Sequence, residues 1–154
     1  MLQFLLFCFY AFVGSFGYCF LANIRPRKHM LFFASLGSGL CWAVYLLFNF
    51  LQNDILQAFL ATTALTIYAE IMARIFKSPA TVYLVISLIP LVPGGGIYHT
   101  MEHCINGDMM AFLQEGSHTF GVAGALALGI LVVTSVMRLF AAAKALRGHH
   151  PQKI

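Results

Sequence analysis

Two prolines followed by three glycines form the stretch whose residue types are best suited to binding chemistry. Pro90 and Pro93 lack a backbone NH and interrupt helical hydrogen bonding, and the glycines after them place no side chain between backbone and ligand. A half-helix that starts after such a break presents free NH groups and the positive end of its dipole to a substrate carboxylate. The predicted substrate path comprises Pro90, Pro93, Gly94, Gly95, Gly96 and Tyr98. The alternative is a kink with a tight turn that binds nothing.

Glu70 is the one acidic residue that falls inside an apolar segment. An ionisable residue within a membrane span is costly and marks a functional candidate, here a proton relay if burial favours the protonated form. Arg74 follows one helical turn later, so a structural ion pair explains the same residue. The ion pair is the favoured interpretation, and the relay stays open.

His99, Glu102 and His103 match H-x-x-E-H, a pattern that places two histidines and a glutamate on one face of a helix at a catalytic zinc. A catalytic zinc also needs a third protein ligand, and such a short motif arises easily by chance. The rest of the sequence offers no soluble scaffold for a protease. We therefore expect no enzyme activity, no cofactor and no metal site, while incidental metal binding by the two histidines stays open.

These residues must be positioned by helices that cross a membrane. Of the 154 residues, 60% are hydrophobic and only 9% are charged, against roughly a quarter charged in soluble domains. The apolar stretches approach the ~20 residues that span a bilayer as helix, and backbone groups in hydrocarbon must bond within their own segment. The prediction is an all-α integral membrane protein with about five transmembrane helices. A single membrane domain, residues 1–154, carries spans at about 2–24, 30–51, 55–74, 79–101 and 117–140.

The distribution of charge predicts the orientation. All nine lysines and arginines fall on one side of this arrangement, which is the cytoplasmic side by the excess of basic residues in cytoplasmic loops. The acidic residues of the loops fall on the other side: Asp54, Glu102, Asp108 and Glu115. We expect the N-terminus outside, the C-terminus in the cytoplasm and a multi-pass protein of the cell inner membrane. The first span carries its charge after the apolar stretch, so it is interpreted as retained rather than as a cleaved signal peptide. The basic clusters flank spans, and no nucleic acid is expected.

The fourth span is predicted to be broken from Pro90 to Gly96. Pro79 is suited to opening a helix, and the 14 residues from there to Val92 extend only about 21 Å, short of the ~30 Å bilayer core. Irregular backbone inside the bilayer is tolerated where it is buried in protein or lines a water-filled cavity.

Small residues at every fourth position indicate close helix packing in the last span. Gly121, Ala125 and Gly129 form this ridge, which favours packing within the chain over a dimer seam, although a homo-oligomer stays open. In the loop before it, Asn106-Gly107-Asp108 is a turn signal. The segment Met109 to Gln114 looks amphipathic and is expected to lie along the outer interface.

The segment from Tyr68 to Met101 resembles the threonine/serine exporter family. The resemblance is carried by Glu70-Ile71-Met72-Ala73-Arg74, by Lys77-Ser78-Pro79-Ala80-Thr81, and by Ile89-Pro90-Leu91-Val92-Pro93-Gly94-Gly95-Gly96-Ile97-Tyr98. It is closest to the short subunit that corresponds to the C-terminal membrane half of full-length exporters. It implies secondary export of small amino acids or related small carboxylates, driven by protons. It also implies a partner, a larger membrane subunit that carries the other half.

Two function classes follow from these observations. The first is one membrane subunit of a two-component secondary exporter, working in the lipid bilayer on a small carboxylate substrate. The second is a non-transporting membrane scaffold or accessory subunit in which the glycine break is only a bend. Export measured with and without the larger subunit separates the two classes.

Overall fold

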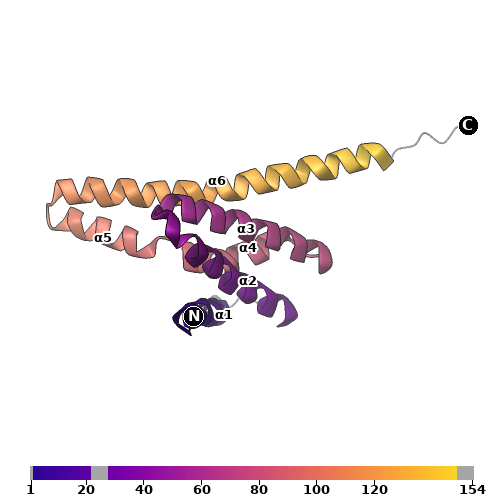
Figure 1. Ribbon diagram of the computed structural model, residues 1–154, viewed down its shortest axis with the longest axis horizontal. Coiled ribbons are helices and arrows are strands. Elements are labelled where there is room, and N and C mark those ends of the chain that lie inside the picture. The colour runs from indigo at the N-terminus through magenta and orange to yellow at the C-terminus, as the bar shows by residue number, and fades with distance from the viewer. Residues whose placement is uncertain (1, 22–27, 149–154) are drawn as a thin grey trace, which may run out of the picture.

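The computed structural model describes residues 2–21 and 28–148, and every regular element in that part of the chain is a helix (Figure 1). The elements are α1 (Leu2–Leu21), α2 (Lys28–Leu47), η1 (Phe48–Leu51), α3 (Asp54–Ile75), α4 (Ala80–Leu88), η2 (Ile89–Leu91), α5 (Gly94–Ile105) and α6 (Met109–Gly148), where η denotes a short 3₁₀ helix. The predicted all-helical fold is confirmed. Residues 22–24 of the first predicted span and the basic residues Arg25, Arg27 and Lys153 lie outside the described residues.

The helices have lengths and compositions suited to a membrane. Within the described residues, three helices are long and apolar enough to cross alone, over Met30–Leu51, Asp54–Ile75 and Met109–Ala143. The pair Ala80–Leu91 and Gly94–Ile105 passes the same test together, although its two halves are bent by 54°. Helix α1 has a shorter apolar part, Gln3–Cys19, and with it a helix lies in each of the five predicted spans.

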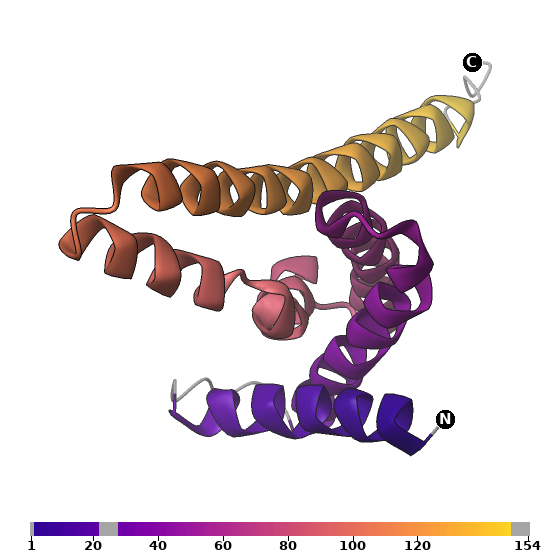
Figure 2. The same cartoon turned by 60° about the vertical axis from the view of Figure 1, so that its left-hand side comes forward.

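The arrangement has α2 and α3 at its centre. Helix α2 packs against α1, α3 and α4, while α6 packs against α3 and, along its first half, against α5. The two views place α1 and α6 on opposite sides of the molecule with α2 and α3 between them (Figures 1 and 2). The end of the α5–α6 hairpin that carries the turn extends away from the other helices (Figures 1 and 2).

Hydrogen bonds between helices hold α2 against its neighbours. The Ser87 hydroxyl of α4 donates to the Ala34 carbonyl at 2.6 Å, and the Tyr68 hydroxyl of α3 donates to the Phe33 carbonyl at 2.7 Å. Gly37 lies where these two side chains meet α2, and a Cβ there would be 2.8 Å from the Tyr68 ring. Close approach at a small residue combined with such bonds is how helices associate where water supplies no driving force.

The ridge of small residues in the last span packs within the chain, as predicted. A Cβ on Gly121 would be 2.8 Å from the Ile55 side chain, and a Cβ on Gly129 would be 3.1 Å from the Phe59 carbonyl oxygen. Ala125, between them, is buried. This face of α6 is therefore occupied by α3.

The turn between α5 and α6 has the predicted geometry, and the segment after it is helical. Gly107 has φ +75°, a conformation that glycine adopts readily, and the Asp108 carboxylate accepts from the Ala111 NH at 3.1 Å to cap α6. Residues Met109 to Gln114 then continue into α6, which runs unbroken for 40 residues. The segment thus forms the first turns of the last helix, and its position at the outer interface stays a prediction.

Candidate functional site

The predicted break in the fourth span is present and is narrower than expected. Helix α4 ends at Leu88, a 3₁₀ turn covers Ile89–Leu91, and α5 begins at Gly94, so only Val92 and Pro93 lie outside a helix. The three glycines form the first turn of α5 rather than an open loop. Proline explains the boundary, since Pro93 cannot donate the hydrogen bond that would continue the preceding turn.

The start of α5 leaves backbone donors unpaired. The Gly94 NH donates to the Val92 carbonyl at 2.7 Å, and the Ile97 NH donates to the Pro93 carbonyl at 3.0 Å. Within the described part of the chain, the NH groups of Gly95 and Gly96 have no backbone acceptor. The first turn of a helix carries such free donors and a partial positive charge, which together attract an anion.

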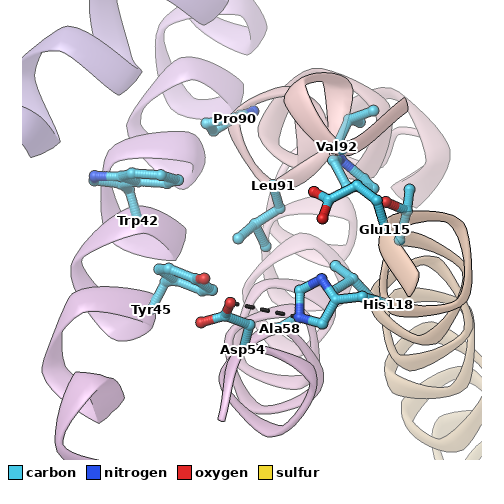
Figure 3. A pocket seen from close by; sticks show the side chains of 13 residues that line it. Trp42, Tyr45, Asp54, Ala58, Pro90, Leu91, Val92, Glu115 and His118 are labelled. Carbon is cyan, nitrogen blue, oxygen red and sulfur yellow. Dashed lines mark ion pairs between the residues drawn. The ribbon is translucent and has the colours of Figure 1, made fainter. Parts of the chain in front are cut away.

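A cavity of about 250 Å³ lies against this break, between α2, α3, α5 and α6 (Figure 3). Its wall is formed by Trp42, Tyr45, Asp54, Ala58, Pro90, Leu91, Val92, Pro93, Gly96, Glu115, His118, Thr119 and Val122. The prolines and Gly96 come from the broken span, the aromatic rings from α2 and the charged side chains from α3 and α6. Segments that are distant in the sequence thus share one small space.

Thr119 is the polar residue that closes the cavity next to α5. Its side chain is only 8% exposed, and its hydroxyl oxygen has no hydrogen-bond partner within the described residues. It lies so close to Gly96 that a Cβ on the glycine would clash with the hydroxyl. Leaving a buried hydroxyl unpaired costs about 1–3 kcal/mol, so the Thr119 hydroxyl would gain stability from an acceptor at the start of α5.

Charged side chains from α3 and α6 line the cavity. His118 Nε2 on α6 is 3.6 Å from Asp54 Oδ2 on α3, and these side chains are 49% and 55% exposed (Figure 3). The Tyr45 hydroxyl lies next to the Asp54 carboxylate, and Glu115 lines the same space. The wall of the cavity therefore carries two carboxylates, Asp54 beside Tyr45 and His118, and Glu115 beside Val92 (Figure 3).

The structure divides the residues predicted for the substrate path into two groups. Pro90, Pro93 and Gly96 line the cavity, whereas Gly94 and Gly95 are not part of its wall and have open space where a Cβ would lie. Tyr98 lies on an exposed face of α5, 66% accessible, beside Glu102 and Ile105.

Glu70 lies far from this cavity, near the C-terminal end of α3. Its side chain is partly buried, and within the described residues no ion pair joins it to Arg74. The choice between a proton relay and a structural pair therefore stays a prediction.

The charged residues of the cavity were not among the site residues predicted from sequence. The sequence places these residues only in or near loops on the side of the membrane opposite the basic clusters: Asp54, Glu115 and His118. The signal that could have found them is topological: the break in the fourth span, the start of α3 and the start of α6 all lie near that same side.

The H-x-x-E-H motif forms a simple contact on α5. His99 Nδ1 lies 3.1 Å from Glu102 Oε2, both on the exposed surface of the helix. Over residues 2–21 and 28–148, no three histidine, cysteine or acidic side chains gather closely enough to hold a metal ion.

Comparison with known proteins adds one finding. The family model described as Threonine/Serine exporter, ThrE, matches residues 7–136, most of the chain and all of the cavity wall. No curated protein and no solved structure matches the chain.

Proposed function

The chain belongs to the threonine/serine exporter family, and we propose that this membrane exporter subunit moves small amino acids out of the cell in partnership with a larger subunit. The proposal includes proton-driven transport across the inner membrane, with the cavity facing the outer side and the C-terminus in the cytoplasm. The family match over residues 7–136 is the observation that carries the transport function. The geometry of the cavity supports the more specific statements.

The cavity suits a small zwitterion. A substrate carboxylate fits the free NH groups of α5 and the unpaired Thr119 hydroxyl, because both are donors. A substrate ammonium fits beside Asp54, and Glu115 adds a second negative charge to the cavity wall. A dicarboxylate would instead place its second negative group against these two side chains. The volume of about 250 Å³ lies below the ~300–1,000 Å³ of sites for drug-sized ligands and so suits a molecule of the size of threonine or serine.

The need for a partner is supported by how open the cavity is. Asp54 and His118 are each about half exposed, whereas binding sites for small molecules bury most of the ligand surface. We infer that the larger subunit supplies the missing wall. An assembly of several copies of this chain is the other arrangement that would close it.

Efflux from loaded cells tests the proposal. Cells that carry both the chain and the larger subunit should lose preloaded threonine or serine faster than cells with either chain alone, and a dicarboxylate should be exported more slowly. Equal efflux from all strains would contradict the exporter proposal and favour the scaffold.

Thr119→Val tests the carboxylate site within this assay. The substitution keeps the shape of the side chain and removes its hydroxyl, so the half-saturating substrate concentration should rise about tenfold to hundredfold, as expected for a lost hydrogen bond to a charged group. Thr134→Val is the matched control, because the Thr134 hydroxyl on the same helix bonds only to its own helix, at 2.8 Å from the Ile130 carbonyl oxygen and 3.2 Å from that of Leu131. An unchanged half-saturating concentration in Thr119→Val would exclude this hydroxyl from substrate binding.

A further inference from the structure

We propose that Asp54 and His118 form the site at which the driving proton and the substrate ammonium compete. This inference rests on the proposed export function and adds to it the residues that couple proton and substrate. In one state the Asp54 carboxylate pairs with the ammonium of the bound amino acid. In the other state it pairs with the protonated imidazole of His118.

The distance between the two side chains makes their contact sensitive to charge. At 3.6 Å, His118 Nε2 and Asp54 Oδ2 are too far apart for a good hydrogen bond, so the attraction between them depends on whether the imidazole carries a proton. Histidine is the side chain whose charge ordinarily changes between pH 5 and 8. The contact joins α3 to α6 at the wall of the cavity, where a change of charge directly alters the binding site (Figure 3).

Few other charged groups face this pair within the described residues. Helix α2 contributes Tyr45, whose hydroxyl lies next to Asp54, and α6 contributes Glu115 one turn before His118. The parts of η2 and α5 that line the cavity, and Val92 and Pro93 between them, contribute no titratable side chain. With neutral His118 the cavity carries two negative charges, and with protonated His118 it carries one. Protonation therefore removes half of the charge that attracts an ammonium.

The exchange needs one proton and no covalent step in the substrate. A proton from the outer solution adds to the imidazole of His118, the imidazolium pairs with Asp54, and the substrate ammonium leaves with the rest of the amino acid. When the cavity opens to the cytoplasm, the imidazole releases this proton, and the ammonium of a new substrate takes its place. Asp54 faces one cation in both states, so neither state leaves its carboxylate unpaired.

Glu70 is poorly placed for this role. It follows Asp54 by 16 residues on the same helix, which corresponds to about 24 Å, and it does not line the cavity. A group that competes with the substrate must lie within contact distance of it, and Asp54 meets this condition.

Counterflow in proteoliposomes tests the competition. Vesicles contain the chain and the larger subunit, with the cavity side facing outward, and are loaded with threonine. The quantity measured is the external threonine concentration that gives half-maximal exchange. It is measured at about pH 5.5 and about pH 7.5, on either side of the pH range in which imidazole ordinarily changes charge. In the unmodified protein this concentration should be higher at the acidic pH, by up to about tenfold per pH unit for one competing proton.

Three variants separate the coupling site from the rest of the protein. In His118→Gln the half-saturating concentration should be the same at both pH values. In Asp54→Asn the response to pH should be much smaller, because the imidazolium then has no Asp54 carboxylate to occupy and only Glu115 still faces it, and the half-saturating concentration should be higher than in the unmodified protein. His99→Gln is the matched control: it removes a histidine with a similar carboxylate contact, 3.1 Å, outside the cavity, and should respond to pH as the unmodified protein does.

The outcomes distinguish this inference from the function on which it rests. A complete lack of threonine exchange by the unmodified assembly overturns the proposed function and the coupling site with it. Exchange that keeps its full pH response in His118→Gln or in Asp54→Asn overturns the coupling site alone and leaves the exporter proposal standing. If His118→Gln does not assemble, the pH response of Asp54→Asn decides.

Discussion

Replacing Gly96 with alanine isolates the contact that joins α5 to α6 beside the cavity. The added Cβ would clash with the Thr119 hydroxyl and would lie 3.3 Å from Thr119 Cγ2. Threonine is β-branched and its χ1 is restricted in a helix, so the hydroxyl cannot turn away without cost. Gly95→Ala is the matched control, because a Cβ at that position meets nothing within 4 Å.

The difference in stability between the two variants can be estimated from the energetic effects that they share and those that only one of them has. Both gain up to about 0.5–1 kcal/mol when alanine replaces a glycine in a helix. Only Gly96→Ala bears the cost of extra atoms in a packed contact, typically about 1–3 kcal/mol. Gly96→Ala should therefore be less stable than Gly95→Ala by about 1–3 kcal/mol, which corresponds to a melting temperature lower by about 2–12 °C for a chain of this size.

Thermal unfolding of the purified chains in one detergent, followed by circular dichroism, measures this difference. Adding Thr119→Ala to Gly96→Ala removes the clashing atoms and should restore the melting temperature to near that of Gly95→Ala. The effects of the two substitutions on stability should therefore not add, as is expected for residues in contact. If Gly96→Ala melts at the same temperature as Gly95→Ala, the close approach of α5 to α6 at this point does not exist and the cavity wall described above is wrong.

Three further predictions concern other parts of the fold. Asn53→Ala should lower the free energy of unfolding by about 0.5–2 kcal/mol in chemical denaturation, because the Asn53 side chain accepts from two NH groups at the start of α3; a smaller change would mean that this cap is not formed. Gly129→Val should lower the melting temperature because the new side chain would meet α3. Gly124→Val should not lower it, because position 124 faces open space. Equal effects of the two substitutions would contradict the packing of α6 on α3. Glu70→Gln should keep pH-dependent efflux, since the coupling proton is assigned elsewhere, and loss of the pH response would return the relay to Glu70.

Features that depend on local residue types could be predicted from the sequence. The helices follow from the apolar segments, because backbone groups in a membrane must bond within their own segment. The break follows from Pro90 and Pro93, and the turn before α6 follows from Asn106-Gly107-Asp108, since these residues restrict the backbone wherever they occur. The ridge of Gly121 and Gly129 indicated close packing, although only the structure identifies α3 as the partner helix.

Features that depend on contacts between helices could not be predicted. The sequence treats the three glycines alike, yet only Gly96 lies against Thr119, because helix rotation decides which of them faces α6. Thr119 itself stands in an ordinary apolar helix, and its burial and unpaired hydroxyl depend on the position of α5. Asp54 and His118 are 64 positions apart in the sequence, and only the packing of α6 on α3 brings them together.

The uninterrupted length of α6 has a mechanical consequence. At 40 residues the helix is about 60 Å long, roughly twice the thickness of the bilayer core, and it rests on α3 near its middle, between Gly121 and Gly129. A stiff rod supported at its centre acts as a lever. A tilt of about 10° about that support would move each end by about 5 Å and His118 by about 2 Å, since displacement grows with the number of 1.5 Å steps from the support. A movement that began near Arg138 would therefore also shift His118 relative to Asp54, because both Arg138 and His118 belong to the same helix.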